Sequence, residues 1–160
     1  QRKVEENYKE GKKDGLSQRW YETGQRESTE NYKDDKRNGL QKEWHTHFDL
    51  KSVVNCKEGK EDGLSKRWYE NGELCRVFKY KDGELNGLQK EWYNNGKLKS
   101  ECNFKDGESN GSYKRWYENG QIEEERKLKN NHPDGLYKKW YENGQLKLQL
   151  NYQNGKLNRL

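Results

Sequence analysis

Glutamates recur at one fixed place in the sequence, where acid–base chemistry can be considered. Each stands two residues after a tryptophan, at Glu22, Glu70, Glu118 and Glu142. Acid–base catalysis needs a unique pocket that shifts the pKa of the catalytic group, whereas these glutamates repeat in one kind of turn. No serine or cysteine stands with a histidine and an acid in a recognisable nucleophile motif. The sequence therefore predicts a protein without catalytic activity and without a cofactor.

Histidines raise the question of a metal site. His45 and His47 are alternate residues at the end of an expected strand, so their rings could face the same way, with Cys56 and His132 as further zinc ligands. The sequence contains neither a CxxC nor an HExxH motif. We therefore expect solvated turn residues here and no metal.

The cysteines give no disulfide framework. Cys56, Cys75 and Cys102 are an odd number without paired spacing. Cys56 and Cys102 fall in columns that suit small buried hydrophobic residues.

The location of the protein is weakly constrained by the sequence. Free thiols favour a reducing compartment. The chain, however, starts inside a repeat and without Met, so we expect that an N-terminal segment has been removed, either by processing, such as the loss of a signal peptide, or by the choice of the expressed segment. We favour a secreted or cell-surface location over a cytoplasmic one.

Lysines form a column two residues before the tryptophans, at Lys42, Lys66, Lys90, Lys114 and Lys138. Basic rows between aromatic residues bind single-stranded nucleic acid or anionic lipid headgroups. The 33 basic residues are offset by 28 acidic ones, which leaves +5, and no four basic residues are consecutive. Nucleic acid is therefore disfavoured. In the structural alternative, the lysine stems cover the tryptophan rings.

The spacing of the tryptophans defines the organisation of the chain. The interval is 24 residues throughout, at Trp20, Trp44, Trp68, Trp92, Trp116 and Trp140. Such a period marks a repeat protein. We expect one repeat domain over 1–160, with partial copies at 1–10 and 152–160 and full copies that start near Gly15, Gly39, Gly63, Gly87, Gly111 and Gly135.

Each copy has the pattern of a β-hairpin. Residues 88–93 alternate in type, 94–96 have the composition of a turn, 97–104 alternate again, and 105–111 form a second turn. The fold class predicted is all-β, an elongated single-sheet solenoid of six consecutive 24-residue hairpin repeats. No run of 18 apolar residues exists, so no transmembrane segment is predicted.

Charge pairing predicts the register of the hairpins. A three-residue turn with left-handed glycine places the residue before each tryptophan opposite the residue seven positions after that tryptophan. This register pairs Arg115 with Glu123 and Glu43 with Lys51. Four of the six such pairs are opposite charges. The alternative two-residue turn would pair Arg115 with Glu124. Because opposite charges stabilise cross-strand pairs, we expect the first register.

Two faces follow from the period of two. We expect one face to carry the tryptophans, the leucines four residues before them and the aliphatic residues six after them. We place a further aromatic column on the same face, at Tyr8, Tyr32, Tyr80, Phe104 and Tyr152. This face would be the more apolar one. A structural ladder of tryptophan rings would replace a conventional core.

The second copy departs from the pattern. Phe48 stands four residues after its tryptophan, where the other copies have a turn glycine such as Gly72 (the turn-glycine column). Asp35 stands where the next copies have a glycine in the link between repeats, such as Gly83 (the link-glycine column). A bulky residue is strained at positive φ. One interpretation is drift in a single copy. The other is a loop in which Phe48, with His45 and His47, contacts a partner, because aromatic anchors dominate interface energies.

The residue pattern resembles a known repeat family. The strings Tyr-Glu-Asn-Gly-Gln-Leu-Lys at 141–147, its near copy at 117–123 and Tyr-Lys-Asp-Gly-Glu-Leu-Asn-Gly at 80–87 are similar to the bacterial variant of the MORN repeat. The resemblance covers essentially the whole chain. It implies a β-hairpin solenoid used for protein or lipid contact, and some members are labelled antitoxins of toxin–antitoxin pairs.

Three functional hypotheses follow. The leading one is a non-catalytic scaffold that binds another protein, for example as a secreted or surface factor in contact with a host. The alternatives are an antitoxin that neutralises its toxin by direct binding and a binder of anionic lipid headgroups. The partner-binding candidates are the lysine column together with His45, His47 and Phe48. The oligomeric state is left open.

Overall fold

The computed structural model describes residues 3–47 and 49–158, and every regular element in these ranges is a β-strand. The chain divides into two compact units, Gln1–Glu84 and Leu85–Leu160. The strands of the first unit are β1 (Val4–Glu5), β2 (Tyr8–Lys9), β3 (Lys12–Lys13), β4 (Gly15–Trp20), β5 (Arg26–Lys33), β6 (Lys36–Arg37), β7 (Gly39–Trp44), β8 (Leu50–Lys57), β9 (Lys60–Trp68) and β10 (Leu74–Lys81). β11 (Glu84–Leu85) spans the division. The second unit contains β12 (Gly87–Trp92), β13 (Leu98–Lys105), β14 (Glu108–Trp116), β15 (Ile122–Lys129), β16 (His132–Trp140), β17 (Leu146–Gln153) and β18 (Lys156–Leu157).

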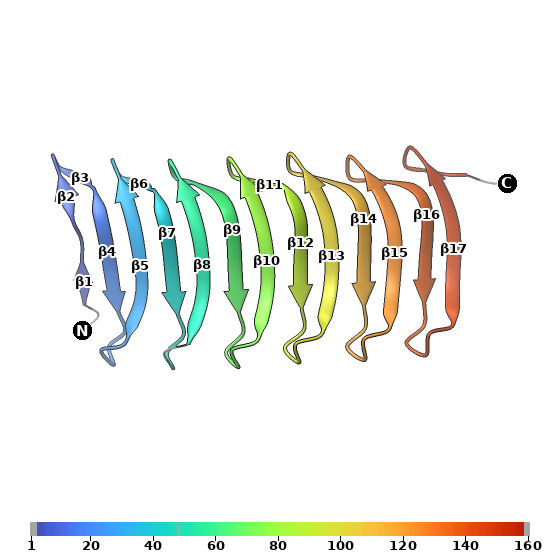
Figure 1. Cartoon of the computed structure of the whole chain (residues 1–160), viewed down its shortest axis with the longest axis horizontal. Helices are drawn as coiled ribbons and strands as arrows, with labels where there is room; N and C mark the ends of the chain where they lie inside the picture. Colours follow the sequence, from blue (N-terminus) through green and yellow to red (C-terminus); the bar gives the residue numbers. More distant parts are fainter. Residues whose placement is uncertain (1–2, 48, 159–160) are drawn as a thin grey trace. The chain divides into compact units, whose positions relative to one another are not determined.

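Within each unit the antiparallel ladder follows the order of the chain. The path is β1-β4-β5-β7-β8-β9-β10 in the first unit and β12-β13-β14-β15-β16-β17-β18 in the second, while β2 and β3 pair separately. Two kinds of turn connect the strands: a wide turn after each tryptophan, such as residues 21–25, and a tight link between repeats, such as residues 82–83. In both units the wide turns lie at one end of the strands and the tight links at the other (Figure 1). The predicted all-β hairpin repeat is confirmed. Among the described residues no helix is long and apolar enough to cross a membrane.

The wide turns have the three-residue form that the sequence predicts. The Tyr21 amide donates to the Gln25 carbonyl (2.8 Å), and the amide of Gly24, at φ +86°, donates to the Tyr21 carbonyl (2.9 Å). Glycine adopts this left-handed conformation without a steric penalty. The second copy keeps the outer bond, from the His45 amide to the Asp49 carbonyl (2.8 Å).

The predicted register, however, is wrong. Trp116 is opposite Ile122, as the turn requires, but the next pair is Arg115 with Glu124. Glu123 is the extra residue of a β-bulge between these two pairs. The same shift follows the wide turn in the other five hairpins. The bulge moves the rest of the return strand by one residue and therefore exchanges its faces.

The bulge also explains why the charge pattern was misleading. Two residues of a bulged strand oppose one residue of its partner, so the extra residue stays beside the residue it was expected to pair with. Arg115 Nε lies 3.0 Å from Glu123 Oε2, and Lys51 Nζ lies 3.5 Å from Glu43 Oε2. The sequence pattern therefore located real ion pairs but not the ladder.

A further correction concerns the faces. Tyr32 is opposite Gly15, and Phe104 is opposite Gly87, so the aromatic column lies on the face opposite the tryptophans. All six tryptophans are half-buried. The fully buried residues all lie on the opposite face, here called the buried face, and are Ser17, Ser28, Glu30, Gln41, Ser52, Cys56, Ser65, Gln89, Glu124 and Leu128. The tryptophans therefore do not form the most buried layer of the sheet, and their role as a structural ladder stays a prediction.

The tight links connect each repeat to the previous one. Both central residues of a link have positive φ, as in Asp82 (52°) and Gly83 (90°), and the Gly83 amide donates to the Glu61 carbonyl (2.8 Å). Asp35 keeps this turn at φ 64°, and its Oδ1 accepts a hydrogen bond from the Lys13 amide (2.7 Å). An aspartate at the link-glycine position therefore leaves the repeat geometry intact.

Candidate functional site

The most accessible apolar surface is the side of the sheet that carries the tryptophans, the leucines four residues before them and the lysine column. We call it the tryptophan face. Five leucines there are 41–52% exposed: Leu40, Leu64, Leu88, Leu136 and Leu146. Exposed apolar side chains gathered on one side of a sheet favour an interaction surface there.

In the first unit the lysine column alternates with valines. Lys42 is opposite Val53, Val53 is also opposite Lys66 on the next strand, and Lys66 is opposite Val77. Directly paired residues lie on one face of a sheet, so these four residues, here called the basic row, are neighbours. Neither Lys42 nor Lys66 has a carboxylate within ion-pair distance in the described part of the chain.

In the second unit the same row alternates in charge. Lys90, Glu101, Lys114, Glu125 and Lys138 are opposite one another in succession. Lys90 Nζ lies 3.7 Å from Glu101 Oε2, and Lys114 Nζ lies 3.4 Å from Glu125 Oε1. We call this the paired row. Its charge is largely neutralised within the chain.

The rows on either side of the basic row contain no acid. One consists of Trp44, Leu50, Trp68 and Leu74, and the other of Leu40, Asn55, Leu64 and Lys79. The cations placed over tryptophan rings are Arg26, at 6.0 Å from the Trp44 ring centre, and Lys3, at 4.8 Å from that of Trp20. Around Lys42 and Lys66 the tryptophan face is therefore apolar, aromatic and basic.

His45 occupies a column that otherwise contains tyrosine. The hydroxyls of Tyr21, Tyr93 and Tyr117 donate to the carbonyl oxygen of the next tryptophan along the chain, at 2.7–2.8 Å. His45 Nε2 lies 3.3 Å from the corresponding Trp68 oxygen. The His45 side chain is therefore engaged in the repeat-to-repeat contact that tyrosine makes elsewhere.

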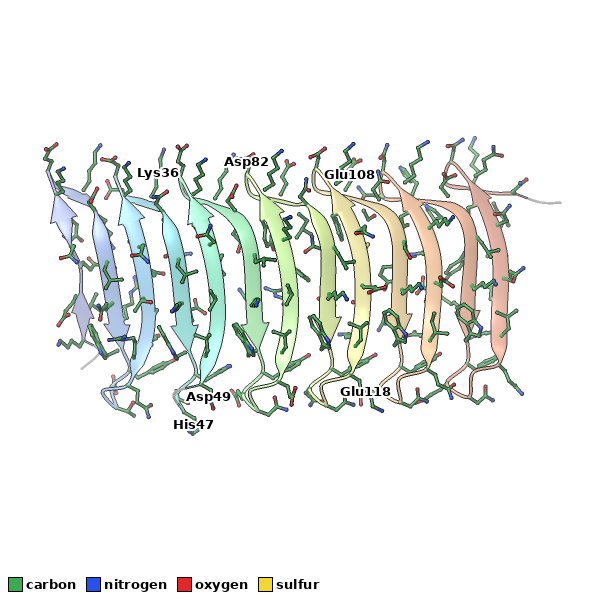
Figure 2. All side chains as sticks on the ribbon, in the orientation of Figure 1. Lys36, His47, Asp49, Asp82, Glu108 and Glu118 are labelled. Atoms are coloured by element: carbon green, nitrogen blue, oxygen red, sulfur yellow. The ribbon has the colours of Figure 1, made fainter. Side chains whose placement is uncertain are left out.

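The other candidates of the second copy lie at the wide turn. Figure 2 shows His47 and Asp49 at that end of the strands, and both are exposed. Phe48 lies outside the described residues, so its proposed contact with a partner stays a prediction. In the described chain no three His, Cys, Asp or Glu residues are grouped so that they could hold a metal.

The glutamates and cysteines have ordinary positions. Glu22, Glu70, Glu118 and Glu142 are all exposed, and Glu118 lies at the wide-turn end (Figure 2). The cysteines are free. Burial raises the pKa of the Cys56 and Cys102 thiols, which disfavours the reactive thiolate.

The buried face of the first unit holds a hollow of about 180 Å³, lined by Arg19, Glu27, Glu30, Arg37, Glu43 and Lys51. Arg37 Nη2 lies 2.6 Å from Glu30 Oε1, and the Tyr32 hydroxyl donates to Glu30 Oε2 (2.7 Å). Lys51 and Glu43 form the pair described above. Since most of these charges already have partners within the chain, the hollow offers a ligand less than the tryptophan face does.

A series of near-identical hairpins with an accessible aromatic face defines a repeat scaffold. The chain belongs to the MORN repeat variant family, whose model matches residues 13–34, 61–82, 85–106, 109–130 and 133–157. The matches omit 35–60, the copy with Asp35 and Phe48, although β7 and β8 form the same ladder there. No curated protein matches the chain significantly.

Sequence reasoning missed the difference between the two units. The residue nine positions after the tryptophan is Thr29, Val53 and Val77 in the first unit but Glu101, Glu125 and Gln149 in the second. This signal was present in the sequence. It went unnoticed because the predicted register did not place these residues beside the lysine column.

Proposed function

We propose that this chain is a non-catalytic repeat scaffold that binds another protein through its tryptophan face. The observation that carries the proposal is the exposure of Leu40 (41%) and Leu64 (52%) beside half-buried tryptophans and unpaired lysines. Aromatic and aliphatic anchors surrounded by polar groups are typical of protein interfaces. A location outside the cell or on its surface is part of this proposal, and cell fractionation would test it.

An anionic lipid surface is a second candidate, favoured by the unpaired Lys42 and Lys66. Sedimentation with liposomes that contain phosphatidylserine, repeated at rising ionic strength, would test it, because electrostatic membrane binding weakens with salt. A toxin is a more specific protein partner within the main proposal. A toxin gene beside the gene of this chain would support the antitoxin role.

The main experiment compares matched surface variants. Leu40→Ser with Leu64→Ser removes apolar contacts from the tryptophan face, while Arg19→Ser with Arg67→Ser changes exposed residues of the opposite face. Partners captured from the native source would be identified by mass spectrometry, purified and titrated by calorimetry. We expect the leucine variant to bind roughly tenfold more weakly and the arginine variant to bind as the parent does. Equal binding by both would contradict the proposal.

A further inference from the structure

The second unit shows which group a lysine of this column binds. There, carboxylates lie 3.4–3.7 Å from the Nζ atoms of Lys114 and Lys90, supplied by the opposite residue of the next strand. In the first unit the position opposite both Lys42 and Lys66 is Val53. The first unit therefore has the cations of the pattern without its anions.

The surroundings favour a ligand that is apolar as well as acidic. Val53 separates the two lysines along the row, and Leu40 and Leu64 are exposed in the adjacent row. A simple anion would leave these apolar side chains uncovered. A protein segment that brings both carboxylates and aliphatic side chains would pair the lysines and remove the apolar surface from water.

The spacing of the row indicates the conformation of such a segment. Neighbouring strands lie about 4.8 Å apart, so Lys42 and Lys66, two strands apart, are separated by roughly 10 Å. Residues seven apart on an α-helix are separated by about 10.5 Å along one face. Same-face residues of an extended strand recur at about 6.8 Å, which does not fit.

We propose, on the basis of the protein-binding function above, that the basic row binds an amphipathic helix of a partner protein. Acidic residues two helical turns apart pair with Lys42 and Lys66, and an aliphatic residue one turn between them covers Val53. The paired row of the second unit does not bind this helix, because Glu101 and Glu125 already hold the lysines and repel its carboxylates.

The test exchanges residues between the rows. Val53→Glu gives the first unit an internal carboxylate like those of the second, and Glu101→Val with Glu125→Val removes both carboxylates beside Lys114. Val53→Thr is the matched control, since it keeps the side-chain shape without adding a charge. The probe is a labelled synthetic helix of about 18 residues with Glu at every seventh position and Leu midway between. Binding is followed by fluorescence anisotropy, with melting temperatures to confirm folding.

We expect Val53→Glu to weaken peptide binding roughly tenfold and Val53→Thr to change it less than about twofold. In the background of Val53→Glu, Glu101→Val with Glu125→Val should restore binding, now at the second unit. A folded Val53→Glu variant that binds the peptide as the parent does would overturn the proposal. So would binding of phosphatidylserine vesicles that depends on Val53 when the peptide does not bind.

These outcomes separate the inference from the proposed function. If capture of the natural partner depends on Leu40 and Leu64 but not on Val53, the helix proposal is wrong and the scaffold function stands. If capture depends on neither, both are wrong.

Discussion

The two units of the chain place the same lysine column in different electrostatic surroundings. Both build the column on the same kind of antiparallel ladder, with the same bulge after the wide turn. One neighbouring position differs, and it is Val53 in one unit and Glu125 in the other. In a repeat scaffold, a surface can therefore change from self-paired to available for a partner without any change in backbone.

The units also differ on the buried face, where one column holds both of the buried hydrophobic residues. Cys56 in the first unit is 6% exposed, and Leu128 in the second is 8% exposed. Both occupy the position twelve residues after a tryptophan. The larger side chain removes more apolar surface from water, so Leu128 contributes more to stability than Cys56 does.

The largest predicted effect comes from this difference. Leu128→Ala should lower the free energy of unfolding by about 2–4 kcal/mol, because it removes three carbons and leaves a cavity. Cys56→Ala should cost about 1 kcal/mol, since only a sulfur is lost. Urea unfolding followed by circular dichroism gives both values. Leu136→Ala, at a site that is 42% exposed, is the control and should cost less than Leu128→Ala. A loss at Cys56 as large as that at Leu128 would contradict the comparison.

Much of the fold could be predicted from the sequence because each repeat carries its own turn chemistry. The glycine columns specify two turns per copy, and the strands between them have a period of two. The structure confirms the hairpins and the three-residue turn. All six copies share one turn pattern, so the substitution of Asp35 for glycine could be recognised by comparison with the other copies.

The register could not be predicted in the same way. A β-bulge adds one residue without a specific residue type to signal it, since the extra position contains Glu27, Lys51, Cys75, Lys99, Glu123 and Lys147 in successive copies. Charge complementarity between Arg115 and Glu123 is satisfied both by direct pairing and by a bulge. The face of the aromatic column and the surroundings of the lysine column depended on that choice, and the prediction of both therefore failed.

The next effect concerns the contact between successive repeats. Tyr117→Phe removes the hydroxyl that donates to the Trp140 carbonyl (2.8 Å), and we expect it to cost about 1 kcal/mol. In the first unit His45 makes the longer contact of 3.3 Å to Trp68. His45→Tyr should therefore stabilise the chain by about 0.5 kcal/mol. Thermal melting of both variants measures the two effects, and destabilisation by His45→Tyr would show that histidine is preferred there.

A smaller effect distinguishes the ion pairs at the bulges. The Arg115–Glu123 pair is 3.0 Å long with its acid 26% exposed, whereas Glu43–Lys51 is 3.5 Å long with both side chains nearly half exposed. Solvent screening reduces the interaction energy of both ion pairs. We expect double-mutant cycles to give a coupling of about 0.5 kcal/mol for the first pair and less than about 0.3 kcal/mol for the second. Equal coupling energies would show that burial does not affect the strength of the ion pairs at the bulges.

The smallest effect is expected when glycine is restored at the two links that lack it. Asp35 and Asn131 hold φ values of 64° and 66°, and their Oδ1 atoms accept from the amides of Lys13 (2.7 Å) and Ser109 (2.8 Å). Replacing either by glycine loses this hydrogen bond but relieves the strain of a side chain at positive φ, and the two terms nearly offset each other. We expect Asp35→Gly and Asn131→Gly to change the free energy of unfolding by less than about 0.5 kcal/mol. Alanine at the same sites loses the bond and keeps the strain, so Asp35→Ala and Asn131→Ala should each cost about 1–2 kcal/mol. If glycine proves as costly as alanine in one unit only, the side-chain acceptor is what holds the repeats together there, and the links of the two units differ as their lysine columns do.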